Sequence, residues 1–250
     1  MQVKINTRAE KADMRDLFGI FFEDLNHAAD GGLYAELIRN RAFEFCSVDN
    51  PDYHGLTSWE KIEKGGKTEL HVEKEHGLFP ENPHYLVMEI LEEGEDIGVC
   101  NHGFGPGIFY EKGAYYDFSC YARKERGDCD KLVVSLRSGT GEIYTSQTFD
   151  ITEKWEKYQL TFQAPCDDRQ GRLAVTAKGS GCVELDFVSL FPVHTYKNRK
   201  NGLRRDLAQL LEEMNPRFLR FPGGCLVHGG SLHAGDRDSL YRWKNTIGPV

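Results

Sequence analysis

Several features that would place a protein in a large class are missing from these 250 residues. No apolar run approaches the ~20 residues that a membrane-spanning helix needs, and the first residues, MQVKINTRAEKADMRD, are polar rather than signal-like. Lysine and arginine are scattered and the formal net charge is -8, whereas a nucleic-acid surface usually shows a concentrated basic patch. We therefore expect a soluble, cytoplasmic chain with no nucleic-acid partner and no membrane partner.

The cysteine patterns that are typical of metal or redox sites are missing as well. The seven cysteines are odd in number, form no CxxC pair and show no metal-like spacing with histidine. We interpret them as free, mostly structural thiols, and we expect neither a metal nor a cofactor. Their positions are Cys46, Cys100, Cys120, Cys129, Cys166, Cys182 and Cys225.

The middle of the chain contains alternating apolar and polar residues. At 40% hydrophobic and 12% aromatic, the composition supports one large domain or two small ones. From about Trp59 to Phe191, short runs alternate with period two, as half-buried antiparallel strands do, and KYQLTFQA is the clearest run. Turn clusters such as RSGTGE and CDDRQG separate several runs, a spacing typical of a two-sheet sandwich or jelly roll. We predict a β-sandwich over residues 55–195.

The two flanks have a different pattern. Four leucines and Met214 recur at helical spacing after Gly202, and Asn215 and Pro216 end the predicted helix. RFLRF then leads into PGGC as a short strand with a glycine turn. The opening run LFGIFF is continuously apolar, which is typical of a strand buried on both faces in a parallel sheet covered by helices. We predict two parallel strands near residues 19–22 and 218–221.

Two carboxylates, Glu23 and Asp24, directly follow the first of these strands. In a (β/α)8 barrel the carboxyl ends of the strands line the active site, whereas the strand interiors fill the core. The acidic pair can equally be the solvated start of a loop, and the glycines of PGGC can mark tight geometry alone. Taken together, the two strand ends suggest a shared pocket rim, at which we expect Glu23 and Cys225 to converge.

A family resemblance is carried by two stretches, LFGIFFEDLNHAADGGLYAELIRNRAFEF and NPRFLRFPGGCLVHGGSLHAGDRDSLYRWKNTIGPV. Both resemble the opening of the catalytic barrel in α-L-arabinofuranosidases of glycoside hydrolase family 51. The sandwich between them resembles the carbohydrate-binding-module-like insert, of the cenC type, in one branch of this family. The implied fold is a β-sandwich inserted into the first part of a truncated (β/α)8 TIM barrel. Residues 1–50 would supply the first barrel strand and helix, and residues 196–250 the next helix, the second strand and a loop.

The resemblance also implies a substrate-binding site, formed by Glu23, Cys225, Trp243 and Asn245. Glu23 would hydrogen-bond sugar hydroxyls in the subsite that holds the arabinofuranose, and a carboxylate suits this role because it can accept from two hydroxyls at once. Cys225 would stand beside the same subsite. We favour a loop-shaping role for three further residues, Asp24, Asn26 and His27. After PGGC, the stretch LVHGG departs from the VEG of many members, which leaves the role of His228 open.

The activity that the resemblance implies is the retaining release of terminal non-reducing α-L-arabinofuranosyl residues from arabinose-containing oligosaccharides or polysaccharides. One glutamate is the nucleophile and another the acid/base, with carboxyls about 5–5.5 Å apart. In the family these glutamates follow the fourth and seventh strands, which lie beyond this chain, and a barrel needs ~200 residues or more. We therefore expect an amino-terminal fragment that is inactive by itself. Whether the full-length protein forms a homo-oligomer stays an open question.

Two other classes of function stay open from the sequence. The chain can be a non-catalytic carbohydrate-binding module with barrel remnants, or the sandwich can be a packing unit. Sugar-binding sandwiches usually present exposed aromatic rings, and NHGFGPGIFY supplies Phe104, Phe109 and Tyr110 beside glycines. Core packing would explain Phe109 and Tyr110 equally, so the exposure of these rings distinguishes the alternatives.

Overall fold

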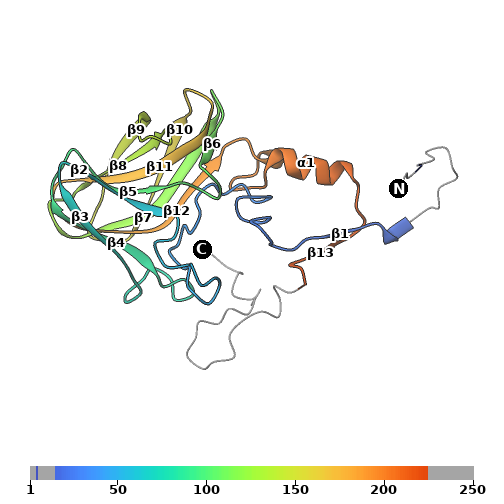
Figure 1. Ribbon diagram of the computed structural model, residues 1–250, viewed down its shortest axis with the longest axis horizontal. Coiled ribbons are helices and arrows are strands. Elements are labelled where there is room, and N and C mark those ends of the chain that lie inside the picture. Colours follow the sequence, from blue (N-terminus) through green and yellow to red (C-terminus); the bar gives the residue numbers. More distant parts are fainter. Residues whose placement is uncertain (1–3, 5–14, 225–250) are drawn as a thin grey trace.

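The computed structural model describes residue 4 and residues 15–224, and two antiparallel sheets dominate it (Figure 1). One sheet has the strand order β10-β7-β12-β4-β3, with β3 (Lys67–Glu73), β4 (Tyr85–Glu92), β7 (Tyr115–Gly127), β10 (Glu156–Gln163) and β12 (Gly181–Pro192). The other has the order β2-β5-β11-β8-β9, with β2 (Trp59–Lys64), β5 (Asp96–Asn101), β8 (Lys131–Arg137), β9 (Ile143–Asp150) and β11 (Asp168–Lys178), and β6 (Ile108–Tyr110) pairs with β11. The β-sandwich predicted for the middle of the chain is confirmed.

The alternation read from the sequence places the side chains as predicted. In β10 the apolar Tyr158, Leu160 and Phe162 face the core, while the polar residues between them are exposed. The strand pairs antiparallel with β7, where Phe118 and Cys120 are also buried. Because strand side chains alternate between faces, each of these strands buries one face and leaves the other open. The large apolar side chains of both sheets form one core.

Strand β12 departs from simple alternation, since every residue from Cys182 to Phe191 is buried. It lies between β7 and β4 in the five-stranded sheet, and the segment around residues 36–41 runs beside its second half, with Val188 N donating to Arg41 O at 2.9 Å. The outward-facing residues in this half of β12 are therefore covered as well. Two acidic side chains of β12 are buried, Asp186 near this segment and Glu184 beside Arg123.

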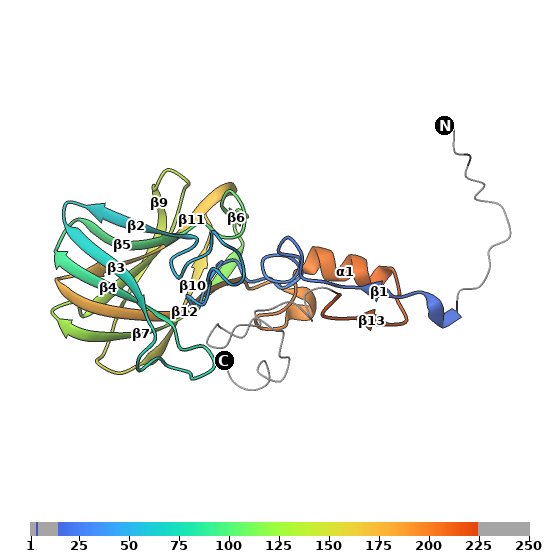
Figure 2. The same ribbon diagram turned by 60° about the horizontal axis from the view of Figure 1, so that its bottom comes forward.

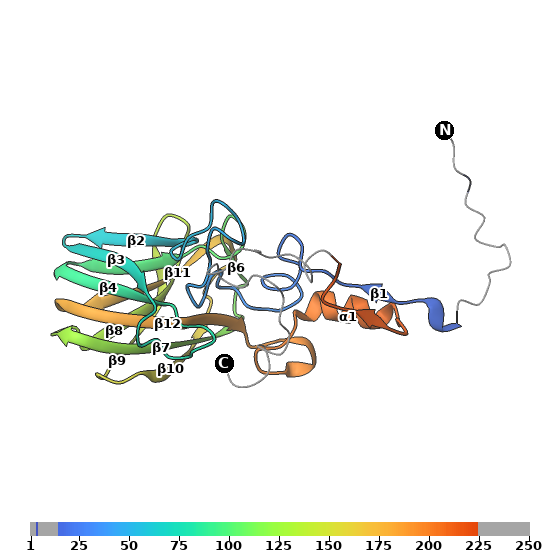
Figure 3. The same cartoon turned by 90° about the horizontal axis from the view of Figure 1, so that it is seen from below.

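Outside the sandwich, β1 (Ile20–Phe21) and β13 (Leu219–Arg220) form a two-stranded parallel sheet. The predicted parallel pairing is confirmed, with Ile20 opposite Leu219 and Phe21 opposite Arg220. The predicted helix is α1 (Arg205–Glu213), which ends before Asn215 and Pro216. Two 3-10 turns, η1 (Arg15–Leu17) and η2 (Tyr196–Asn198), complete the elements. Figures 2 and 3 show that α1, β1 and β13 lie together beyond one end of the sandwich.

The expected first barrel helix within residues 1–50 is not found in the described residues, because residues 15–50 form turns, bridges and the single strand β1. Asn26, His27, Asn40 and Phe43 have φ angles of 53°, 62°, 54° and 57°. A left-handed backbone conformation interrupts an α-helix wherever it occurs. The division of the flanks into pieces of a TIM barrel stays a prediction.

The run LFGIFF predicted that both faces of the two parallel strands are buried, and this prediction is wrong. Phe21 is 54% exposed and Leu219 is 59% exposed. Within residues 15–224 no further strand pairs with β1 or β13, so neither sheet edge is extended. Ten large apolar side chains on or near β1, β13 and α1 are exposed, and we call them the flank patch: Leu17, Phe18, Phe21, Leu25, Leu203, Leu210, Met214, Phe218, Leu219 and Phe221.

Exposed apolar side chains that gather on neighbouring elements often mark an interaction surface. We expect the isolated chain to self-associate through the flank patch at micromolar concentrations. Leu219→Ser should weaken association roughly threefold to tenfold, because association would bury only the exposed half or so of the leucine side chain. Sedimentation velocity over a concentration series measures the effect. Ile143→Ser is the matched control, because Ile143 is 52% exposed on β9 of the sandwich. Equal weakening by both variants would contradict the prediction.

In the described part of the chain, no helix is long and apolar enough to cross a membrane.

Candidate functional site

Glu23 lies directly after β1, where the parallel pair ends in a glycine turn. The ladder continues one step past the strand, with Phe22 N donating to Arg220 O at 2.9 Å. Gly224 N then donates to Glu23 Oε1 at 3.1 Å, although the two residues are separated by 201 positions in sequence. Parallel strands lie ~4.8 Å apart, so residues at their exits become neighbours. The two strand ends therefore meet at one site, and we call it the strand-end site.

The glycine turn after β13 is required by this contact. Gly223 has a φ of +122°, and a Cβ at this position would come within 2.4 Å of Glu23 Cγ. A side chain here would therefore displace Glu23 and strain the backbone. The glycines of PGGC thus do more than form a tight turn, because they make room for the carboxylate side chain.

Three of the four predicted substrate-binding residues, Cys225, Trp243 and Asn245, lie outside the described residues, as does His228. Convergence of Glu23 with Cys225 therefore stays a prediction. The contact between Glu23 and Gly224 concerns the residue immediately before Cys225.

The residues after Glu23 shape the loop that leads away from the strand-end site. Asp24 Oδ1 accepts from Ala29 N at 2.8 Å, and Asn26 has a left-handed backbone conformation. The His27 ring packs edge-on against Phe104 of the sandwich, with ring centroids 5.3 Å apart. Burial, with a smaller contribution from Arg39, lowers the pKa of His27. The preference for loop-shaping roles for these three residues agrees with these contacts.

Glu36 connects the loop to the sandwich, and its role was not found from the sequence. Its side chain is fully buried, and Oε1 accepts from the backbone N of Leu37, Ile38 and Leu190, each at 3.0 Å. Oε2 accepts from Ser189 Oγ at 2.5 Å and lies 3.7 Å from Arg41 Nη1. Burial raises the pKa of Glu36, while Arg41 and these hydrogen bonds oppose the rise. The one signal in the sequence is a single acid inside the otherwise apolar run LYAELI.

Asp186 is a second buried carboxyl, on the outer side of the five-stranded sheet. Oδ1 accepts from Phe187 N at 2.7 Å, and Oδ2 has no hydrogen-bond partner among the described residues. Burial raises the pKa of Asp186 to about 8. The hydrogen bond from Phe187 N–H and the charge of Arg41 lower this pKa, whereas the charge of Glu44 raises it further. Asp186 belongs to β12 of the sandwich, apart from the parallel pair that carries Glu23.

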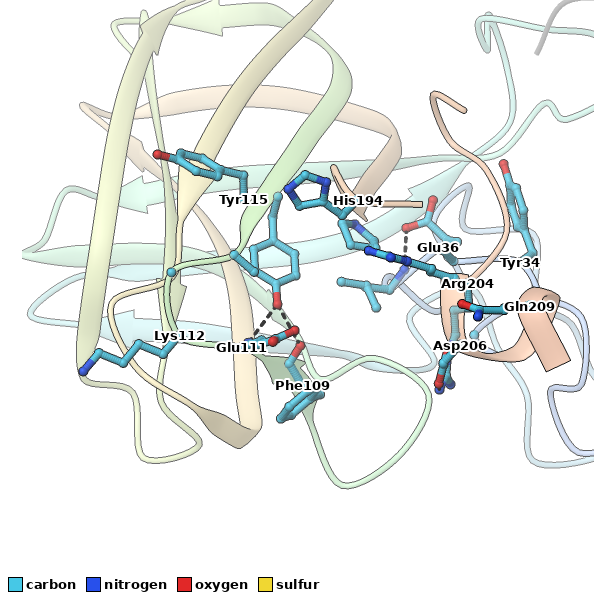
Figure 4. A pocket seen from close by; sticks show the side chains of 18 residues that line it. Tyr34, Glu36, Phe109, Glu111, Lys112, Tyr115, His194, Arg204, Asp206 and Gln209 are labelled. Atoms are coloured by element: carbon cyan, nitrogen blue, oxygen red, sulfur yellow. Dashed lines mark hydrogen bonds and ion pairs between the residues drawn. The ribbon is translucent and has the colours of Figure 1, made fainter. Parts of the chain in front are cut away.

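A cavity of about 1040 Å³ lies where the sandwich meets the flank, and we call it the junction cavity (Figure 4). Four segments line it. They are residues 31 and 34–37 of the linker, by which we mean the segment between Glu23 and β2; residues 109 and 111–116, from β6 to the start of β7; Pro192 and His194 at the end of β12; and residues 204–206 and 209 at the start of α1. Elements far apart in the sequence therefore contribute to one hollow. Figure 4 shows Glu111, His194 and Arg204 around it.

The three aromatic rings predicted as glycan-binding candidates have different environments. Tyr110 is fully buried and its hydroxyl donates to Arg172 O at 2.8 Å, so it is a core residue. Phe104 is half-buried against His27. Phe109 is 49% exposed and lines the junction cavity. Strand alternation explains the contrast, because Phe109 sits between the buried Ile108 and Tyr110 in β6.

Comparison with known proteins supports the family resemblance. No family model matches the chain. The extracellular exo-α-L-arabinofuranosidase of Streptomyces chartreusis is 41% identical over 261 residues, which cover 99% of this chain and 29% of that protein. α-L-Arabinofuranosidase 1 of Arabidopsis thaliana is 35% identical over 261 residues, covering 100% of this chain and 36% of that protein.

A solved structure extends the similarity to the fold. The arabinose-bound MgGH51 α-L-arabinofuranosidase matches with a TM-score of 0.77 and 30% identity, covering 92% of this chain and 37% of that one. The chain thus spans about a third of the length of the proteins it matches, between 29% and 37% in these three. By sequence over its whole length and by structure over most of it, the chain is therefore related to one part of the α-L-arabinofuranosidases of glycoside hydrolase family 51.

Proposed function

We propose that this chain is the amino-terminal part of an α-L-arabinofuranosidase that releases terminal non-reducing α-L-arabinofuranosyl residues from arabinose-containing oligosaccharides or polysaccharides. The observation that carries the proposal is the strand-end site, where residues 201 positions apart bring Glu23 to a glycine turn. The relatives at 41% and 35% identity are named for this activity.

In this proposal Glu23 binds the arabinofuranose and does not break the glycosidic bond. A carboxylate can accept hydrogen bonds from two sugar hydroxyls and so orient the ring. Retaining hydrolysis needs a nucleophile and an acid/base about 5–5.5 Å apart, and the family resemblance puts both glutamates beyond this chain. Binding by Glu23 then contributes to the rate only as far as its hydrogen bonds strengthen in the transition state.

A chimera tests the proposal: this chain replaces the aligned segment of the Streptomyces chartreusis protein. We expect the chimera to hydrolyse an aryl α-L-arabinofuranoside, and Glu23→Gln to lower kcat/KM roughly 10- to 100-fold, as the loss of a charged hydrogen-bond acceptor would. The 250-residue chain alone should give no turnover above a buffer blank. Asp24→Asn is the matched control, because its side-chain oxygen can still accept from Ala29 N.

Two results would contradict the proposal. Turnover by the isolated chain that is lost in Glu23→Gln would mean that catalytic carboxylates lie within these residues. A folded, monodisperse chimera whose hydrolysis is insensitive to Glu23→Gln would remove Glu23 from the substrate site. The cytoplasmic location and a homo-oligomeric full-length protein also stay proposals, and the name of the Streptomyces relative describes that protein as extracellular.

A further inference from the structure

We propose that the junction cavity binds a stretch of neutral oligosaccharide, outside the arabinofuranosyl subsite at Glu23. The choice of sugar as ligand rests on the proposed function. Pockets that bind small molecules usually measure ~300–1,000 Å³, and this one, at about 1040 Å³, is slightly larger. It has room for a ligand larger than one monosaccharide.

The cavity offers aromatic rings that are open to a ligand. Phe109 is 49% exposed and Tyr115 is 45% exposed, and both belong to its lining. The guanidinium carbon of Arg169 lies 5.6 Å from the centre of the Phe109 ring, which restricts the ring without burying it. The apolar C–H face of a sugar ring can replace water on such a surface. The neighbouring Tyr116 is buried, so the exposure is specific to these positions.

Polar side chains around the same cavity are available for hydrogen bonds. The side chains of Glu111, His194 and Arg205 line it, and within residues 15–224 none of them makes a hydrogen bond or ion pair. The carboxylate can accept, the guanidinium can donate, and the imidazole can do either. Sugar hydroxyls both donate and accept, so one ligand can satisfy all three groups.

The distribution of charge selects a neutral ligand. Arg204 is paired with Asp206, with Nη2 and Oδ2 2.6 Å apart. The other charged residues of the lining balance in sign, with Glu36 and Glu111 against Lys112 and Arg205. A polyanion would meet these two acids, and a cation would meet these two bases. Neither sign of ligand is favoured over the whole lining.

The position of the cavity fits a substrate that extends away from the strand-end site. The lining begins at Gly31, eight residues after Glu23. Even a fully extended chain of that length spans at most ~28 Å. An oligosaccharide bound at its arabinofuranosyl end by Glu23 can therefore reach the cavity, where its other residues would gain contacts without taking part in bond cleavage.

Titration calorimetry of the 250-residue chain with a linear arabinan hexasaccharide and an arabinose-substituted xylohexaose tests the proposal. We expect millimolar or tighter binding of at least one of them, roughly tenfold weaker binding by Phe109→Ala, and several-fold weaker binding by Glu111→Gln. Ile143→Ala, an equally exposed apolar side chain on β9, is the matched control and should leave binding unchanged. Because Phe109 and Glu111 are exposed, both variants should melt like the wild type.

Any of three results would overturn the proposal. These are binding of neither oligosaccharide, binding that Phe109→Ala and Glu111→Gln leave unchanged, and stronger binding of an acidic oligogalacturonide. If Phe109→Ala lowers the melting temperature, its weaker binding could reflect loss of fold, and the effect of Glu111→Gln on binding is then the test. Hydrolysis by the chimera tests the proposed function and binding to the isolated chain tests the cavity, so the two can fail separately.

Discussion

Glu36→Ala should lower the free energy of unfolding by roughly 3–5 kcal/mol, the cost of removing one partner from a buried charged network. The substitution removes the oxygen that accepts from the backbone N–H groups of Leu37, Ile38 and Leu190. Leu37 N still donates to Leu190 O at 3.0 Å, so the loss falls on Ile38 and Leu190. Those groups stay buried, because Ile38 and Leu190 belong to the core. Chemical denaturation followed by tryptophan fluorescence measures the loss, and Trp59 reports on this region because its Nε1 donates to Asn40 O at 3.0 Å.

The matched variant is Glu36→Gln, which keeps one oxygen for the backbone N–H groups and changes only the side that faces Ser189 and Arg41. We expect it to lose about 1–2 kcal/mol. Hydrogen exchange distinguishes detachment of the linker from global unfolding, because detachment would expose the Leu190 amide while the amides of β10 stay protected. A Glu36→Ala protein as stable as the wild type to within about 0.5 kcal/mol would show that these hydrogen bonds contribute little.

The elements that the sequence predicted well are those decided by local pattern. Period-two alternation in KYQLTFQA corresponds to β10, and leucine spacing before Asn215 corresponds to α1. Both patterns state which face of an element is apolar, and burial of that face is what stabilises the element. The run LFGIFF also gave the correct parallel pairing.

Burial around that run could not be predicted, because it depends on what else packs there. Phe21 and Leu219 are apolar and half exposed in the structure. An apolar residue type favours burial, but it does not show whether another element is present to bury it. The strand-end site was half predictable for a similar reason. The carboxylate and glycines stand out in sequence, but the requirement for glycine at Gly223 arises from its φ of +122° and from the close approach of Glu23, which is distant in sequence.

The buried acids Glu36 and Asp186 were not predicted because single charged residues in apolar runs do not reveal their partners. Glu36 is stabilised by Ser189, 153 positions away. Asp186 follows the expected outward alternation of β12, yet it is buried because the segment around residues 36–41 runs beside that face. Both cases depend on a contact between the linker and the sandwich, and no periodicity within one segment encodes such a contact.

Asp186 should make the stability of this protein depend on pH across the neutral range. Its pKa is about 8 in the folded chain against an ordinary value of 3.8, so between these values the folded state binds more protons than the unfolded state. The free energy of unfolding then falls as pH rises through this window and levels off above pH 8. A difference of one pKa unit corresponds to ~1.4 kcal/mol, which makes a loss of up to ~4 kcal/mol between pH 5 and pH 8.

Asp186→Asn should remove most of this dependence, because the amide resembles the neutral carboxyl and does not ionise. We expect the variant to match the wild type within about 1 kcal/mol at pH 5 and to exceed its stability at pH 8. Urea denaturation at half-unit pH intervals measures both profiles. Asp150→Asn serves as the control, since the Asp150 side chain is 79% exposed and paired with Lys131 at the surface, where an ion pair contributes little.

Glu36 adds a pH dependence of the same sign, because its pKa is also raised, so only the difference between the stability profiles of the wild type and Asp186→Asn tests the role of Asp186. Parallel profiles for the two proteins would mean that the Asp186 carboxylate is already ionised in the folded chain at neutral pH, with Arg41 compensating its burial.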